Sequence, residues 1–276
     1  MILSIIILIL VGFLSAIIGS LVGIGGGIII VPTLIYFGVT MNVLEGITPQ
    51  TAIGTSSIIL IATGLSSTIG YLKQKQVDIK NGFLFLIGII PGALIGAYLS
   101  QYLTIHSFNL YFGIFLIVVA IMLMIRHRIP PIKAFQQERY MKSFTDAHGE
   151  HYRYGVVPSI AIIASFVIGL TAGLFGIGGG ALMTPLMLLV FRFPPQVAVG
   201  TSMMMIFFSS LTGSIGHIVL GHVLWGYSII LIISSWIGAQ IGVKLNKTVK
   251  SDTVVLILRL VMLALGVYLI IRSFFN

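Results

Sequence analysis

Two motifs place small polar side chains inside otherwise apolar sequence. They read PQTAIGTS over residues 49–56 and PQVAVGTS over residues 195–202. Proline suits the first turn of a helix, so each motif predicts a helix start. Such a turn has unpaired N–H groups and about half a positive charge, so it can bind an anion without lysine or arginine. The side chains that add donors there are Gln50, Thr51, Thr55, Ser56, Gln196, Thr201 and Ser202.

Two glycine clusters precede these motifs, in GIGGGIIIVP (residues 23–32) and GIGGGALMTP (residues 176–185). Glycine and proline cost a helix about 1 and 3 kcal/mol relative to alanine, and unpaired backbone costs still more in a membrane. Runs of three glycines suit unwound backbone whose amides face a ligand. We expect such breaks to let helix N-termini from two halves face each other and hold an anion near the membrane midplane. The glycines are Gly25, Gly26, Gly27, Gly178, Gly179 and Gly180.

Structural interpretations of the same residues stay open. Glycines at small-residue spacing allow close helix packing, which we favour for Gly88, Gly92 and Gly96. Serine and threonine in membrane helices often bind backbone carbonyls or bridge helices. A nucleotide-binding loop is excluded, because no Lys-Ser/Thr pair follows the glycines and no strand–helix–strand pattern surrounds them.

The elements that must position these motifs are membrane helices. The chain has 276 residues, of which 58% are hydrophobic and 8% charged, with a mean hydropathy of +1.14. Because about 20 apolar residues span a bilayer, this composition predicts an all-α polytopic protein in a lipid bilayer, with its first helix retained rather than cleaved as a signal peptide. Apolar segments cover about residues 2–22, 27–39, 50–72, 81–103, 108–125, 155–175, 180–192, 196–219, 224–245 and 253–272.

The second and seventh segments, 27–39 and 180–192, are short for a bilayer crossing. They are either short tilted helices or the returning arms of hairpins that turn at the glycines. Both alternatives predict the same sidedness for every loop that follows.

The chain repeats itself. The two PQ motifs match at an offset of 146 residues and the glycine clusters at 153, which leaves a seven-residue insertion in the first half. Each copy has five segments, and an odd number predicts that the second copy enters the membrane from the opposite face, as an inverted repeat. We expect a first transmembrane repeat over 1–126, a partly helical cytoplasmic linker over 127–153 and a second repeat over 154–276.

The basic residues are clustered. Twelve of the 15 lysines and arginines lie in 73–80, 126–153 and 244–250, between apolar segments. The positive-inside rule predicts that these loops are cytoplasmic and that the N-terminus lies outside, in a multi-pass inner (plasma) membrane protein. This distribution explains the net charge of +9 without nucleic acid as a partner.

Few ionisable residues lie within the apolar segments. His217 either carries a proton or is structural, Arg259 either reaches the interface or forms a fixed charge, and Gln240 either lines a path or binds a neighbouring helix. No carboxylates pair within a segment and there is no cysteine, so neither a metal site nor another cofactor is predicted. A serine–histidine pair (Ser209 or Ser214 with His217) lacks a nucleophile turn, so no enzyme is predicted.

The paired GxGGG clusters and PQ-x-A-x-G-T-S motifs resemble those of the sulfite exporter TauE/SafE family, and the resemblance covers nearly the whole chain. It implies a permease for small sulfur-containing anions such as sulfite, sulfonates or sulfoacetate. Its candidate binding residues in this chain are Gly25–Gly27 with Gln50, Thr55 and Ser56, and Gly178–Gly180 with Gln196, Thr201 and Ser202.

The sequence therefore predicts a secondary transporter for a small anion, working by alternating access. The alternatives are an anion channel and a membrane-embedded enzyme or assembly factor. Proton symport, sodium symport and facilitated diffusion all fit the residues, and the sequence leaves the direction of transport and the oligomeric state open.

Overall fold

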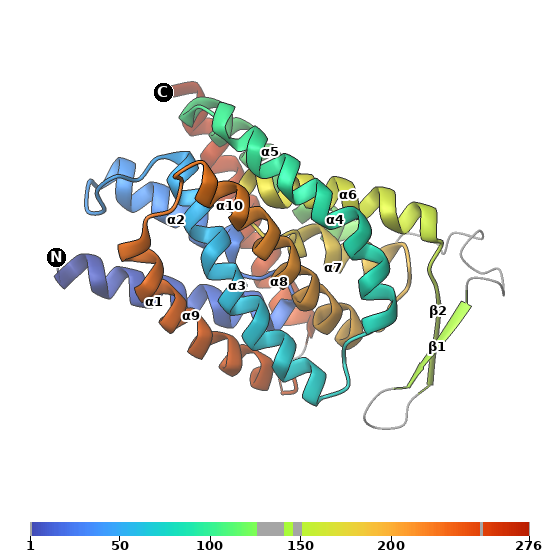
Figure 1. Cartoon of the computed structure of the whole chain (residues 1–276). Helices are drawn as coiled ribbons and strands as arrows, with labels where there is room; N and C mark the ends of the chain where they lie inside the picture. The colour runs from blue at the N-terminus through green and yellow to red at the C-terminus, as the bar shows by residue number, and fades with distance from the viewer. Residues whose placement is uncertain (1, 126–140, 146–150, 249–250, 276) are drawn as a thin grey trace.

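The computed structural model describes residues 2–125, 141–145, 151–248 and 251–275. Its helices lie side by side in one bundle, and a small β-hairpin projects from one end (Figure 1). Between α2 and α3 a π-helical turn covers Tyr36–Thr40, and a 3-10 turn over Ser100–Tyr102 follows α4. The helices are α1 (Ile2–Val22), α2 (Gly27–Ile35), α3 (Pro49–Lys73), α4 (Ile79–Leu99), α5 (Ile105–Ile125), α6 (Pro158–Phe175), α7 (Gly180–Leu189), α8 (Pro195–Val219), α9 (Trp225–Leu245) and α10 (Ser251–Phe275).

The prediction of a polytopic membrane protein is confirmed. Within the described ranges, seven helices are long and apolar enough to cross a bilayer. Large apolar side chains point outward from the bundle, among them Ile163 at 67% exposure and Leu260 at 58%. Such a surface is too apolar for water and suits contact with lipid.

The two short segments are returning arms. The helices α2 and α7 contain 9 and 10 residues, too few to span a bilayer. After α2 the chain comes back to the start of α1, where the Ser4 hydroxyl donates to the Val43 carbonyl (3.1 Å). After α7 it comes back to the start of α6, where the rings of Phe193 and Tyr154 lie 4.1 Å apart. Each hairpin therefore enters and leaves on one side.

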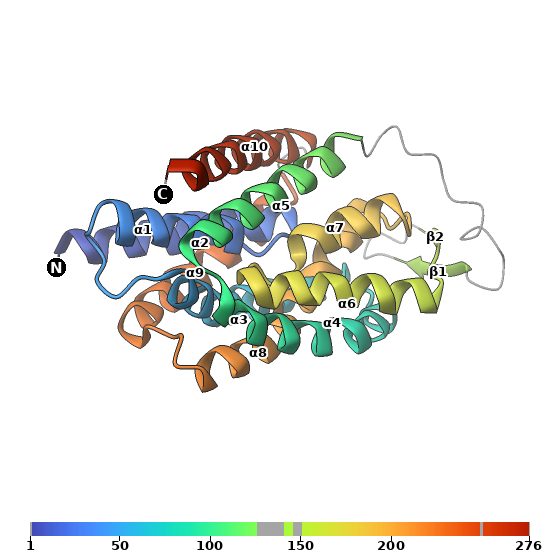
Figure 2. The same cartoon turned by 90° about the horizontal axis from the view of Figure 1, so that it is seen from above.

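Helix packing is consistent with the predicted inverted repeat. The helices α4 and α6 pack together, as do α1 and α9, and each pair joins the two halves (Figures 1 and 2). The equivalent helices α3 and α8 run antiparallel, because Gly54 lies against the His222 carbonyl and Gly200 against that of Gln76. A two-fold axis perpendicular to the helices would produce such an antiparallel pair, so this packing is consistent with inverted topology.

Glycines allow the closest of these contacts. A Cβ added at Gly88, Gly92 or Gly96 of α4 would lie 2.1–2.2 Å from a carbonyl oxygen of α6. These three glycines therefore serve helix packing, as their spacing predicts.

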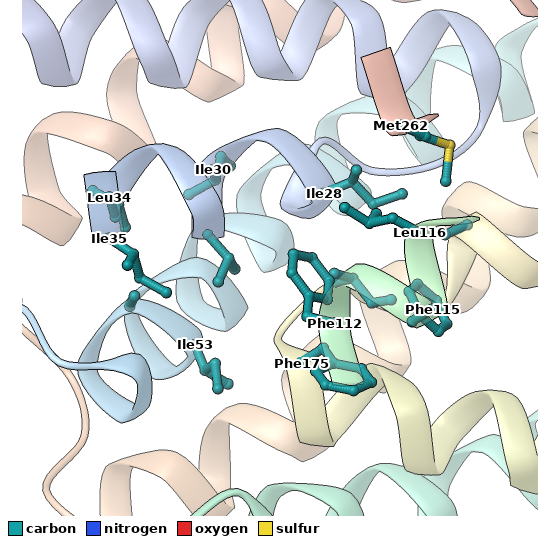
Figure 3. Packing of buried hydrophobic residues seen from close by; sticks show 14 of the residues in the cluster. Ile28, Ile30, Leu34, Ile35, Ile53, Phe112, Phe115, Leu116, Phe175 and Met262 are labelled. Atoms are coloured by element: carbon teal, nitrogen blue, oxygen red, sulfur yellow. The ribbon is translucent and has the colours of Figure 1, made fainter. Parts of the chain in front are cut away.

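The first returning arm is held by apolar packing against both halves. Ile28, Ile30 and Leu34 of α2 are buried, and Figure 3 shows them in one cluster with Ile53 of α3, Phe112 of α5 and residues of the second half. The second half contributes Phe175 from the end of α6, whose ring centroid lies 5.2 Å from that of Phe112. This cluster fixes α2 beside the second half.

The part of the predicted linker that the structure describes is a β-hairpin and contains no helix. Met141–Thr145 and His151–Gly155 form antiparallel strands β1 and β2, paired from Met141 with Gly155 to Thr145 with His151. Aromatic and threonine residues favour strands over helices. The rest of the predicted linker, 127–140 and 146–150, lies outside the described residues.

A hydrogen bond ties this hairpin to the bundle. The Tyr154 hydroxyl donates to Asp78 Oδ2 (2.6 Å), and Asp78 Oδ1 accepts from the Asn81 amide at the start of α4 (3.1 Å). Burial raises the pKa of the Tyr154 phenol, and the bonded Asp78 raises it further, so the hydroxyl stays protonated.

The basic loops gather at one end of the bundle. Lys73, Lys244 and Lys247 line one surface pocket there, and the hairpin joins the same end through Asp78. The start of α1 lies at the other end, where the Glu45 amide donates to the Tyr227 hydroxyl (3.0 Å). The basic loops therefore share one side, opposite the start of α1, as the charge pattern predicts.

Candidate functional site

Both glycine clusters interrupt helices. The helix α1 ends at Val22 and α2 starts at Gly27; between them Gly23, Gly25 and Gly26 have φ of 80°, 86° and 84°. Between α6 and α7 the angles are 65°, 70° and 74° at Gly176, Gly178 and Gly179. An L side chain is strained in this left-handed region, which explains why glycine occupies these positions.

The two breaks lie against each other. A Cβ on Gly27 would lie 2.7 Å from Ile177 Cα and 2.8 Å from the Gly176 oxygen. A Cβ added at Gly180 would lie 2.8 Å from the Gly23 carbonyl oxygen. The N-termini of α2 and α7, one from each half, thus meet inside the bundle. Amides in a first helical turn have no acceptor within their own helix, so both turns present donors and positive dipole ends.

Two aliphatic side chains fill the space between the breaks. Leu60 of α3 and Ile206 of α8 are fully buried, and they occupy equivalent positions at the 146-residue offset. A Cβ on Gly25 or Gly178 would contact both of them, at 2.8–3.2 Å. We call Leu60 and Ile206 the central pair; it covers the unwound glycines from the sides of α3 and α8.

The motif serines hold the broken ends of the opposite half. Ser56 donates to the Gly176 carbonyl (2.7 Å) and Ser202 to the Gly23 carbonyl (2.8 Å). The Thr184 hydroxyl also donates to the Gly23 carbonyl (2.7 Å). These hydroxyls satisfy carbonyls left free by the ends of α1 and α6, so they stabilise the breaks.

The motif threonines bind the chain before α9 and α4. Thr55 Oγ1 accepts from the Leu224 amide (3.1 Å) and Thr201 Oγ1 from the Asp78 amide (2.9 Å). Leu224 and Asp78 precede the first residues of these helices and are related by the repeat offset. Both threonine oxygens are therefore engaged in structural bonds.

This contact makes a prediction for Thr201. The substitution Thr201→Val should lower the free energy of unfolding by about 1–3 kcal/mol, because it leaves the buried Asp78 amide without an acceptor. Thr201→Ser keeps the oxygen and should cost less. Thermal denaturation of the purified protein in detergent measures both. If Thr201→Val is as stable as the wild type but fails to bind anion, the hydroxyl contacts the substrate rather than Asp78.

The starts of α3 and α8 do not meet near the midplane, contrary to the expectation for the PQ motifs. These helices are antiparallel and 25 residues long, so their N-termini lie roughly 37 Å apart at 1.5 Å per residue. Gln50 donates to the Leu103 carbonyl, Thr51 forms a capping box with Thr48, and Gln196 is exposed. The N-termini that meet are those of α2 and α7.

The remaining predicted residues lie away from the breaks. Gln240 is exposed in the basic pocket, which measures about 380 Å³ and lies between α3 and α9. Arg259 donates to the Leu123 carbonyl (2.9 Å), where a cation complements the C-terminus of α5.

His217 is buried, and its Nε2 lies 3.1 Å from the Gly173 oxygen. Burial lowers the pKa of its neighbour His222, in the loop after α8.

Several residues around the breaks are not predicted by the sequence to lie there, although it suggests Ser209 or Ser214 as a partner of His217. The central pair carries no polar group, although the repeat offset that aligns the PQ motifs also relates its two members. Ser209 donates to the Gly178 carbonyl (2.8 Å). Ser210 and Ser214 are buried, and neither hydroxyl has a hydrogen-bond partner within the described ranges. Among the residues that the structure describes, no three or more histidine, cysteine or acidic side chains lie close enough together to hold a metal ion.

Known proteins resemble this chain over nearly its whole length. The family model described as "Sulfite exporter TauE/SafE" matches residues 8–269. "Probable membrane transporter protein YunE" from Bacillus subtilis (strain 168) is 44% identical, covering 99% of this chain and 100% of the relative. A probable membrane transporter protein from Methanocaldococcus jannaschii is 27% identical, covering 96% and 94%. No solved structure matches.

Proposed function

The chain belongs to the sulfite exporter TauE/SafE family and is a membrane transporter, and on that premise we propose that it carries a small sulfur-containing anion by alternating access. The family's members are named as transporters rather than enzymes. Sulfite, a sulfonate or sulfoacetate is the substrate class. The anion binds at the N-termini of α2 and α7, near Gly25–Gly27 and Gly178–Gly180.

The meeting of these two N-termini is the observation that supports the proposal. Gly27 of α2 lies against Ile177, and Gly180 of α7 against Gly23, so dipole ends and free amides from both halves converge. Broken helices that converge in this way bind anionic groups in secondary transporters. Amides bind an oxyanion without a formal positive charge, and therefore release it more readily than a buried lysine would.

The central pair lies halfway along the bundle, since each of its residues is the twelfth in a 25-residue helix. Leu60 and Ile206 come from antiparallel helices of opposite halves and cover the same glycines. Rocking one half against the other opens one side of the site while keeping the other covered, which is alternating access. The hydrogen bonds of the motif serines must rearrange in this change, since each serine binds a break of the opposite half.

The charge distribution indicates how the protein is oriented in the membrane. Lys73, Lys244 and Lys247 line the pocket at the basic end, which we place in the cytoplasm of a cell bounded by this inner membrane. Lysines at an entrance raise the local concentration of anions. Glu45 lies at the opposite end, which we place outside.

Purified protein in liposomes tests this function. We expect external sulfite or sulfoacetate to drive counterflow of the same labelled anion from loaded vesicles, at least about tenfold faster than taurine, which carries no net charge. Sulfate, thiosulfate and lactate complete the panel. Saturable counterflow distinguishes a carrier from an anion channel, which conducts without exchange. Absence of exchange for every anion would contradict the proposal.

A further inference from the structure

One face of α8 carries a line of buried polar side chains that are not hydrogen-bonded in the way that their counterparts in the first half are. Ser210, Ser214 and His217 lie on one face of α8, at i, i+4 and i+7. All three are at most 3% exposed. Ser210 lies beside the second break, with its Oγ 3.0 Å from the position of a Cβ on Gly178. His217 lies toward the end of α8, with its ring 6.1 Å from that of His222. The line runs from the break toward the non-basic end.

Buried polar atoms along this line lack partners. The hydroxyls of Ser210 and Ser214 and the Nδ1 atom of His217 make no hydrogen bond to any described residue. Buried polar groups in native proteins are nearly always paired, so three such atoms on one helix face point to a ligand that they bind.

In the first half, the equivalent region is filled by side chains that are hydrogen-bonded to one another and to backbone. There the Ser20 and Ser67 hydroxyls bond each other (2.7 Å), and the Tyr71 hydroxyl donates to the Ser20 carbonyl (2.7 Å). At the repeat offsets, Gly173 and Gly213 replace the two serines and His217 replaces the tyrosine. A Cβ on Gly213 would meet nothing closer than 3.9 Å. The second half therefore lacks the hydrogen-bonded serine pair and has two glycines and the His217 imidazole at the equivalent positions.

The contact of the imidazole fixes its tautomer. The Gly173 carbonyl can only accept, so His217 Nε2 carries a hydrogen and donates to it (3.1 Å). In the neutral ring Nδ1 is then a bare acceptor, which repels an anion. Protonation turns Nδ1 into a donor and adds a positive charge that is unfavourable in this interior unless an anion pairs with it.

We propose that the transported anion, on its way from the breaks toward the non-basic end, passes Ser210 and Ser214 and pairs with one proton on His217, so that the transporter is a proton–anion symporter. This inference rests on the proposed function and names its coupling ion. Water at the non-basic end supplies the proton to Nδ1, and the same proton leaves Nδ1 when the anion is released. Because binding is reciprocal, the proton raises the affinity for the anion as much as the anion raises that for the proton.

Few other titratable groups face this place in the described part of the chain. Apart from His222, α4 contributes Lys80 and Tyr98, both exposed, and α3 contributes Tyr71 and Lys73 at the opposite end. The other helices that pack against α8, namely α1, α6 and α7, contain no titratable side chain. His217 is therefore the buried group that can take up the proton.

The first experiment measures coupling in liposomes that contain a pH-sensitive dye. For the wild type, sulfoacetate uptake should bring in one proton per anion, and an inwardly directed proton gradient should accumulate sulfoacetate at least about tenfold. Sulfoacetate is used because its sulfonate and carboxylate stay ionised near neutral pH, whereas bisulfite would carry a proton in by itself. His217→Gln keeps a donor for Gly173 but cannot titrate, so exchange should persist at a reduced rate with proton uptake lost. Tyr71→Phe at the equivalent position should leave coupling intact. Proton uptake that persists in His217→Gln would overturn the proposal.

The second experiment does not depend on that variant folding. The natural chain contains no cysteine, so Ser214→Cys provides a single thiol. A membrane-impermeant thiol reagent should label it from the non-basic side at least about tenfold faster than it labels Thr68→Cys, the counterpart in the first half, from the basic side, and anion should slow the labelling of Ser214→Cys. Equal labelling of both would overturn the proposal. Absence of any exchange by the wild type would remove the proposed function as well, whereas exchange without proton uptake would overturn the coupling alone.

Discussion

Replacing Gly27 by alanine is expected to abolish most transport while the chain still folds. The added Cβ would lie 2.7 Å from Ile177 Cα and 2.8 Å from the Gly176 oxygen, both backbone atoms of the opposite break. Backbone cannot rotate away as a flexible side chain can, so the two breaks must move apart. Overpacking of this kind costs about 1–3 kcal/mol of stability.

The effect on transport follows from the geometry of the amides. If the breaks separate, donors from α2 and α7 no longer reach one anion together. A hydrogen bond to a charged group contributes about 1.5–3 kcal/mol, so losing one weakens binding about tenfold or more. Counterflow by Gly27→Ala in liposomes should fall by at least that factor, and thermal denaturation shows how much folded protein remains.

Gly226 provides a matched control. It lies in the first turn of α9, and a Cβ added there would meet no atom within 4 Å. Gly226→Ala should keep full transport and gain up to about 1 kcal/mol from helix propensity. Normal counterflow by folded Gly27→Ala would show that the meeting of the two breaks is not the anion site.

The sequence predicts the helices and their breaks because membrane insertion leaves little freedom. Long apolar segments such as 50–72 and 196–219 must be helical, since no other open structure pairs its backbone in lipid. They correspond to α3 and α8. Runs of three glycines predict the breaks equally well, since positive φ at Gly25 and Gly178 favours residues without a Cβ.

The site is less predictable because hydroxyl groups bind substrate and backbone equally well. The types and spacing of Thr55 and Thr201 suit anion binding, yet their oxygens accept amides at the starts of α9 and α4. In each case the amide that donates to the threonine lies 123 residues or more away in sequence, so only the fold reveals it. Similarly, the antiparallel pairing of α3 and α8 separates the two PQ motifs, and no local pattern encodes this pairing.

Removing the central pair should change which anions are carried. Leu60 and Ile206 contact the glycines of both breaks, so their volume sets the space left for a bound anion. The variants Leu60→Ala and Ile206→Ala each remove buried methyl and methylene groups, at a cost of about 2–5 kcal/mol in stability. Since they also widen the site, we expect the flux of a bulky aromatic sulfonate relative to sulfite to rise at least about tenfold, consistent with about 1.4 kcal/mol of relieved crowding.

Volume-conserving changes separate size from chemistry. Leu60→Met and Ile206→Leu keep the pair apolar and similarly large, and such exchanges usually cost less than about 1.5 kcal/mol, so the flux ratio should stay near that of the wild type. Competition counterflow with both anions in one vesicle preparation gives the ratio independently of how much protein is active. An unchanged ratio in folded Ile206→Ala would mean that the anion passes elsewhere. A rise in both alanine variants would place the permeant anion between the two halves, because the two side chains come from different halves and contact the same unwound glycines.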